Sequence, residues 1–181
     1  MAKQSCLIVL SASPLGVSAP SFLQCYKLTQ SAFNIEIATP EATPPVFIDK
    51  DDQSSRWLND IAAKNLLEPR SLSEVQGGQY SCVVVPHSPG ASEDLASCKV
   101  LGKILTHCLA ERKPVCAIGL GVCALLSAVK GEPPQWAFRD IALTGTKQRK
   151  MIRRHNKLAT DYKSFLSSTH LPGNVLLLQK L

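Results

Sequence analysis

The residues best placed to do chemistry surround a glycine turn, Gly119-Leu120-Gly121, which follows the apolar run Val115–Ile118. A turn of this kind between a buried strand and a helix points backbone N–H groups at whatever lies above it. A Cys or Ser at the apex would suit a nucleophile elbow, because the helix dipole favours a thiolate and nearby amides can form an oxyanion hole. Residue 119 is glycine, so the apex supplies no nucleophile.

Two thiols near this turn could take the part of a nucleophile. Cys123 lies one helical turn beyond Gly119, near a helix amino-terminus that could lower the pKa of its thiol, and Cys116 lies three residues before Gly119 in the predicted strand. The simpler interpretation is that both are small core residues, the commonest fate of an intracellular cysteine.

Other polar candidates lie in the loop that follows residue 86. His87 is the best lone candidate for a base, although a solvated loop histidine or a backbone hydrogen-bonder needs no function. Glu93 and Asp94 are most simply charges that complement a helix dipole. The turn at residues 89–91 could bind a small anion through its amides, but a plain structural turn is the simpler interpretation.

Elements at regular spacing must position these residues. Apolar runs predict strands at residues 7–10, 34–38, 80–86 and 115–118, and helical periodicity predicts helices at residues 18–33, 54–67, 95–112 and 121–130. Strands that alternate with helices predict an α/β fold with a doubly wound, mostly parallel sheet covered on both faces. The functional crevice of such a sheet lies beyond the carboxyl ends of its strands.

Composition limits the class of protein. The seven cysteines form no CxxC pair and no Cys/His cluster with zinc spacing, so we expect neither metal nor cofactor, and their odd number favours a reducing, cytoplasmic compartment. No apolar stretch approaches the ~20 residues of a membrane helix. The run at residues 6–10 is shorter than the ~7–15 residues of a signal-peptide core, and we interpret it as the first strand.

Separated blocks of the sequence resemble a known superfamily. Residues 80–130 resemble the central half of ThiJ/PfpI domains, which are relatives of the class I glutamine amidotransferases. Features of one branch of that superfamily recur as GVSAPSF (16–22), AFNIEIATP (32–40), PHSPGA (86–91), CAIGLGVCALL (116–126) and WAFRDIALTG (136–145). The resemblance implies a flavodoxin-like, class I glutamine amidotransferase-like domain over residues 1–146, and this many blocks are more specific than a lone glycine motif.

The same resemblance implies that the chemistry of the superfamily is missing. Many members carry a cysteine, often followed by histidine, after the fourth strand, and an acidic side chain after the first strand. The matching positions here are Gly119, Leu120 and the segment Leu-Gly-Val at residues 15–17. We therefore expect a pseudoenzyme with a vestigial elbow at Gly119, Leu120 and Gly121, and the competing interpretation is a hydrolase or deglycase that uses Cys123 or a bound water.

Resemblance to this branch further implies partners. It implies self-association and a place as a subunit of the FERRY Rab-effector complex, which links messenger RNA to early endosomes. The chain would then be cytoplasmic and reach the early endosome by association, and its link to messenger RNA would be indirect. Nothing in composition or spacing identifies these partners.

The resemblance ends near residue 145, where the charge balance also changes. Residues 1–146 contain 12 Lys and Arg and 13 Asp and Glu, a net charge of −1, whereas residues 147–181 contain 8 and 1, a net charge of +7. We expect an incomplete domain at 1–146, with an open apolar sheet edge, and an atypical basic tail at 147–181. An alternative exon, a retained intron or a gene-model error would explain both changes.

The basic tail has two interpretations. Residues that could contact an anion, RNA phosphates or an acidic membrane surface are Lys147, Arg149, Lys150, Arg153 and Arg154. The simpler interpretation is a solvated or disordered tail without a partner, because like charges at i, i+4 repel and no aromatic residues lie between them.

Overall fold

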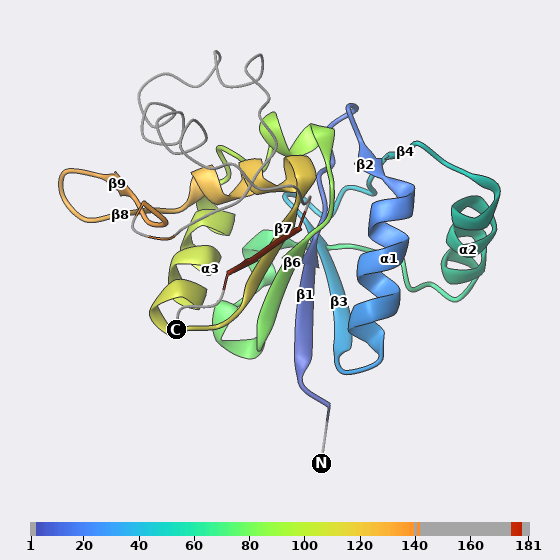
Figure 1. Ribbon diagram of the computed structural model, residues 1–181, viewed down its shortest axis with the longest axis horizontal. Helices are drawn as coiled ribbons and strands as arrows, with labels where there is room; N and C mark the ends of the chain where they lie inside the picture. Colours follow the sequence, from blue (N-terminus) through green and yellow to red (C-terminus); the bar gives the residue numbers. More distant parts are fainter. Residues whose placement is uncertain (1–2, 140, 142–174, 179–181) are drawn as a thin grey trace.

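The computed structural model describes residues 3–139, 141 and 175–178. Within them the main sheet has the strand order β10-β7-β6-β1-β3-β5 (Figure 1). Its strands are β1 (Ser5–Val9), β3 (Asn34–Thr39), β5 (Arg70–Ser71), β6 (Cys82–Val85), β7 (Val115–Ile118) and β10 (Val175–Leu178). Neighbouring strands pair in parallel except β10, which pairs antiparallel with β7. The predicted parallel α/β sheet is confirmed, and its order is the flavodoxin-like one.

Three α-helices and several short elements complete the described fold. The helices are α1 (Ala19–Gln30), α2 (Asp52–Ala63) and α3 (Lys99–Ala110). Short 3₁₀ segments are η1 (Leu72–Glu74), η2 (Gly77–Gln79), η3 (Pro89–Ser92) and η4 (Gly119–Ser127). Two small ladders pair β2 (Val17–Ser18) with β4 (Phe47–Ile48) and β8 (Val129–Lys130) with β9 (Gln135–Trp136).

The sheet is buried on both faces, as continuous apolar strands predict. Along β1, Leu7 and Val9 join the core that packs against α3 and η4, whereas Cys6 and Ile8 join the core that packs against α1 and α2. Figure 1 shows α1 and α3 on opposite sides of the sheet. Both helices therefore hold the strands in place below the loops at the carboxyl edge.

The predicted helix at residues 121–130 is wrong. The chain instead forms the 3₁₀ segment η4 and then enters β8. The carbonyl of Leu125 accepts the indole N–H of Trp136 at 2.8 Å and the amide of Ala128 at 3.3 Å. Because these contacts take up a carbonyl that a continuing α-helix would use, the helical segment ends at Ser127.

The bounds of two other helices differ from the predicted ones. Helix α2 begins at Asp52, earlier than the predicted residue 54, because Asp51 and Ser54 form a reciprocal capping box. Helix α3 begins only at Lys99, because Leu95 is taken up in the turn that precedes it. Val100, in the first turn of α3, is 38% exposed.

The carboxyl-terminal segment contributes a strand to the sheet. β10 lies within the predicted tail and pairs along all four residues of β7, from Val175 opposite Ile118 to Leu178 opposite Val115. The edge of β7 that was expected to be open is therefore covered. The basic residues Lys147, Arg149, Lys150, Arg153 and Arg154 lie outside the described residues. In the described part of the chain, no helix is long and apolar enough to cross a membrane.

Candidate functional site at the Gly119 elbow

The turn after β7 has the geometry of an elbow. Gly119 adopts a φ of +53°, in the left-handed region that residues with a side chain rarely adopt. A Cβ added at Gly121 would lie 2.7 Å from the carbonyl oxygen of Val85, so the turn also passes very close to the end of β6. Each glycine thus meets a separate physical requirement, and the predicted tight turn is confirmed.

The imidazole of His87 occupies the space above the apex. A Cβ added at Gly119 would overlap His87 Nδ1 and lie 3.0 Å from His87 Cγ. In addition, the backbone N–H of Leu120 donates to His87 Nδ1 at 2.9 Å. In a nucleophile elbow, the N–H of the residue after the nucleophile is an oxyanion-hole donor. Here His87 takes up both the volume of the nucleophile and the donor beside it.

The position of His87 is fixed by the amino-terminal end of α1. Its backbone N–H donates to the Ser21 hydroxyl at 2.9 Å, and its carbonyl accepts the N–H of Ser18 at 2.9 Å. Burial lowers the pKa of the imidazole, and the Asp49 carboxylate opposes that shift. Because Nδ1 accepts a hydrogen bond, the neutral ring carries its proton on Nε2.

Two carboxylates lie against the loop that follows β1. Asp94 accepts the Ser11 hydroxyl at 2.9 Å, the Ala12 amide at 2.7 Å and the Ser13 amide at 3.2 Å, and Glu93 accepts the Ser13 hydroxyl. The prediction that these acids complement a helix dipole is wrong, because α3 begins several residues later. They instead bind together the loops after β1 and β6.

Backbone amides of the turn at residues 89–91 donate hydrogen bonds within the chain. The Gly90 N–H donates to the Gly16 carbonyl at 3.1 Å, and the Ala91 N–H donates to the Ser88 carbonyl at 3.1 Å. The Ser88 hydroxyl also donates to the Gly16 carbonyl at 3.1 Å. These bonds join the crevice loops after β1 and β6, and they favour the structural interpretation of the turn.

The two candidate thiols pack against the cores on the two sides of the sheet. Cys123 packs partly buried against the core under α3, and burial raises its pKa to about 11. Cys116 packs against the core under α1. Burial, and to a smaller extent the nearby Cys82, raise the pKa of its thiol. A thiol with a raised pKa carries little thiolate at neutral pH, which makes it a weak nucleophile.

The contact between His87 and Gly119 escaped sequence reasoning. Their loops follow β6 and β7, which are neighbours in the sheet, so the topology brings them together across 32 positions of sequence. The sequence feature that could have predicted this contact is that the two loops follow strands that are neighbours in a parallel sheet. Among residues 3–139, 141 and 175–178, no group of three His, Cys, Asp or Glu side chains could hold a metal ion.

Comparison with known proteins finds relatives over most of the chain. The chain is 42% identical over 154 residues to glutamine amidotransferase-like class 1 domain-containing protein 1 of Xenopus laevis, covering 85% of this chain and 67% of that protein. It is 38% identical over 151 residues to the protein of the same name from Homo sapiens, covering 83% of this chain and 68% of that one. No family model matches the chain.

Solved structures share the fold at low sequence identity. Glyoxalase III of Candida albicans superposes with a TM-score of 0.59 at 12% identity, covering 74% of this chain and 64% of that one. A ThiJ/PfpI domain protein of Brachyspira murdochii gives 0.54 at 16% identity, covering 70% and 65%. These likenesses concern the fold alone, which is that of the ThiJ/PfpI proteins.

Proposed function

The chain belongs to the family of glutamine amidotransferase-like class 1 domain-containing protein 1, and on this basis we propose that it is a non-catalytic amidotransferase-like subunit that acts as an interaction module. One observation supports the proposal most strongly. The imidazole of His87 lies where the side chain of a nucleophile at residue 119 would project, and it accepts the Leu120 N–H that would otherwise stabilise an oxyanion.

The acidic groups near the elbow are also occupied by hydrogen bonds within the chain. The loop after β1 carries no acid of its own. Of the two carboxylates that reach it, Asp94 is occupied by the hydroxyl of Ser11 and the amides of Ala12 and Ser13, and Glu93 by the hydroxyl of Ser13. An acid held by several donors at once is a structural support for two loops. The site thus keeps the scaffold of an amidotransferase-like domain and uses its polar groups to rigidify it.

The proposed partners rest on the resemblance to this family. We propose that the chain self-associates and is a subunit of the FERRY Rab-effector complex, which links messenger RNA to early endosomes. Other subunits would then contact the RNA, and the chain would be cytoplasmic and reach the endosome by association. The chain spans about two thirds of its relatives' length, so the interfaces of the longer proteins need not all be present.

Native co-purification tests this proposal directly. The full tagged chain is purified under native conditions from cells of its own source, treated with ribonuclease and examined by mass spectrometry. We expect a stoichiometric hetero-complex that includes a Rab-binding subunit and survives the ribonuclease. A chain that elutes alone at its own mass, like an unrelated tagged control domain of the same size, would contradict the proposal.

The competing proposal is a hydrolase or deglycase that works through Cys123 or a bound water. It requires a reactive thiol, whereas burial raises the pKa of Cys123 to about 11. Iodoacetamide labelling as a function of pH separates the two proposals. Slow alkylation at neutral pH without turnover supports the interaction module, and rapid alkylation of Cys123 that abolishes a measured activity supports the enzyme.

A further inference from the structure

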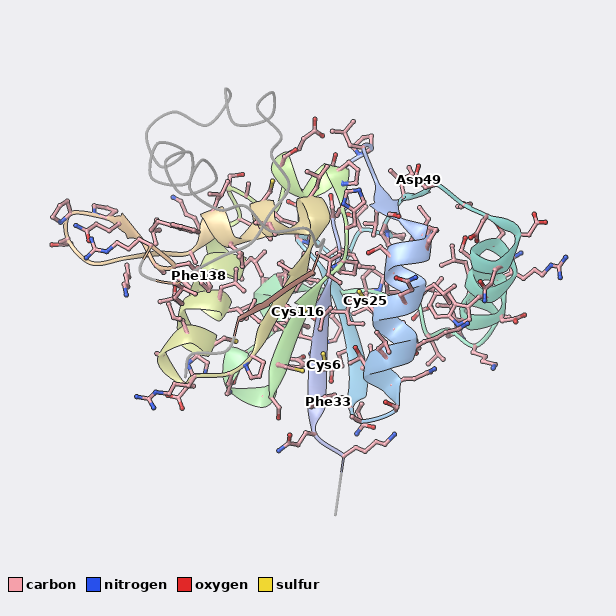
Figure 2. The ribbon with its side chains drawn as sticks, in the orientation of Figure 1. Cys6, Cys25, Phe33, Asp49, Cys116 and Phe138 are labelled. Carbon is pink, nitrogen blue, oxygen red and sulfur yellow. The ribbon has the colours of Figure 1, made fainter. Side chains whose placement is uncertain are left out.

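Four thiols lie on one face of the sheet. Cys6 on β1, Cys82 on β6, Cys116 on β7 and Cys25 on α1 all belong to the core under α1, and none forms a disulfide. Figure 2 labels Cys6, Cys25 and Cys116, which lie over the central strands. The elbow does not use these groups, so the face carries chemistry that the proposed function leaves unexplained.

Cys6 and Cys82 are opposite each other on neighbouring strands. They are register partners in the parallel pair β1 and β6, so both side chains project to the same face at the same height. Neighbouring strands lie about 4.7–4.9 Å apart, and a disulfide needs Cα atoms roughly 4.4–6.8 Å apart. Cys116 differs, because its register partner on β6 is Val84.

The two thiols differ in exposure. Cys6 is fully buried, and the neighbouring Cys82 thiol and then burial raise its pKa. Cys82 is partly exposed at the beginning of β6, and the neighbouring Cys6 thiol lowers its pKa. Cys82 is therefore the thiol that solvent and a small oxidant reach, and Cys6 lies beside it on the neighbouring strand.

We propose that Cys6 and Cys82 form a redox-active dithiol whose oxidant is hydrogen peroxide. The Cys82 thiolate attacks one peroxide oxygen, the O–O bond breaks, and Cys82 becomes a sulfenic acid while the second oxygen leaves and is protonated to water. The Cys6 sulfur then attacks Cys82 Sγ, the S–S bond forms, the S–O bond breaks, and the Cys6 proton leaves with the oxygen as a second water. Two thiols thus supply the two electrons that reduce one peroxide.

The modification would act on the two strands that flank the crevice. β1 and β6 are the strands whose following loops carry Ser11 and His87, so a bond between them links the supports of the elbow. Because Cys82 is partly exposed, a disulfide there would be open to reductants, as suits a reversible site in a reducing compartment. The inference is independent of whether the elbow is catalytic.

Peptide mapping after oxidation tests the proposal. The purified full chain is treated with hydrogen peroxide under native conditions, blocked with N-ethylmaleimide and digested with trypsin without reduction. We expect a disulfide between tryptic peptides 4–27 and 71–99, with Cys6 and Cys82 lost together, and its disappearance on addition of a reductant. Cys82 found as sulfinic acid without a link would overturn the proposal.

Matched variants assign the sulfurs, because each peptide holds a second cysteine. The link should be absent in Cys82→Ser and in Cys6→Ala, and it should remain in Cys98→Ser and Cys25→Ser. If the buried Cys6→Ala variant fails to fold, the partly exposed Cys82→Ser variant decides alone, with circular dichroism as the check on its fold. A link that persists in Cys82→Ser, or that vanishes in Cys98→Ser, would contradict the assignment.

Discussion

The apex of the elbow depends on two residues that are far apart in sequence. Gly119 needs to lack a Cβ both because its φ is +53° and because His87 fills the space beside it. The ring in turn satisfies the Leu120 N–H, which a helical amino-terminus would otherwise leave for a ligand or water. The space at the apex and the Leu120 N–H are therefore both taken up within the chain.

Replacement of Gly119 by alanine measures this relationship. We expect Gly119→Ala to lower the free energy of unfolding by about 1–3 kcal/mol, from the left-handed backbone and from overlap with His87. His87→Gly removes the overlap but not the backbone cost, so the double variant should recover part of the loss. Urea unfolding of the four proteins gives a coupling of roughly 0.5–3 kcal/mol if the side chains interact. Strict additivity would show that His87 does not fill the site.

The titration of His87 provides a second test at this scale. Burial lowers the pKa of the folded ring below its ordinary value of about 6.5, so the unfolded chain binds a proton first as the pH falls. Its contribution to stability is full above pH ~6.5 and is lost as the pH falls through the folded pKa. Nitrogen NMR should find the Nε2–H tautomer, and the pH dependence of unfolding should flatten in His87→Gln. A folded pKa above 6.5 would contradict this assignment.

Among the elements, α3 and η4 position the elbow by close backbone contact. A Cβ at Gly102 in α3 would lie 2.8 Å from the carbonyl carbon of Ser127 at the end of η4. Alanine normally stabilises a helix interior relative to glycine by about 1 kcal/mol. Any loss of stability at this position therefore reports packing between the two elements.

Gly102→Ala is expected to destabilise the protein. Overpacking against a backbone that cannot move freely costs roughly 1–3 kcal/mol, which exceeds the gain in helix propensity. Gly78→Ala is the matched control, since the nearest atom to its added Cβ is 3.9 Å away, on His107. Denaturant unfolding of both variants should separate them, and equal stability would show that α3 and η4 are not in contact through this residue.

The loops after β1 and β6 are joined by Asp94. We expect Asp94→Asn to lower the free energy of unfolding by about 1–3 kcal/mol, because an amide replaces an acceptor that binds the Ser11 hydroxyl and the amides of Ala12 and Ser13. Hydrogen exchange should increase at Ala12 and Ser13. Glu93→Gln, which affects only the Ser13 hydroxyl, serves as the milder control, and an equal effect of both would refute the assignment.

Strands and helices could be predicted where the apolar pattern of a segment by itself decides its secondary structure. The apolar runs identified β1, β3, β6 and β7, and their alternation with helices identified the parallel sheet. The end of η4 could not be predicted from its own sequence, because it depends on a hydrogen bond from the Trp136 indole, outside the segment, to the Leu125 carbonyl. Nor could the role of Asp94, whose partners are amides of a distant loop. The strand-like run Val-Leu-Leu-Leu could have predicted β10. The change in charge instead favours the interpretation of residues 147–181 as one tail.

In the molecule as a whole, the parallel strands of the family fold are joined by β10, which pairs antiparallel with β7. β10 covers the edge of β7, so its removal should leave β7 as an edge strand with unpaired backbone groups. We expect truncation after Gly145 to lower Tm by several degrees and to promote self-association that rises with concentration. Light scattering and calorimetry measure both effects.

A charge variant separates the strand from the basic residues. Substitution of five of the eight Lys and Arg of the tail by glutamine leaves the sequence of β10 unchanged, so Tm should remain within a degree or two of the parent chain. The five cations are Lys147, Arg149, Lys150, Arg153 and Arg154. If the tail bound RNA directly, affinity would fall steeply with salt and vanish in this variant. We expect no such salt-dependent binding by the isolated chain, since its proposed link to RNA is indirect.

A turnover assay distinguishes a non-catalytic domain from an enzyme that uses Cys123. The purified chain and its Cys123→Ala variant are incubated with glutamine and with methylglyoxal, beside an active ThiJ/PfpI enzyme as positive control. We expect no turnover above the protein-free rate for either protein, because His87 fills the apex and the thiol of Cys123 stays protonated at neutral pH. Turnover by the parent chain that Cys123→Ala abolishes would contradict it.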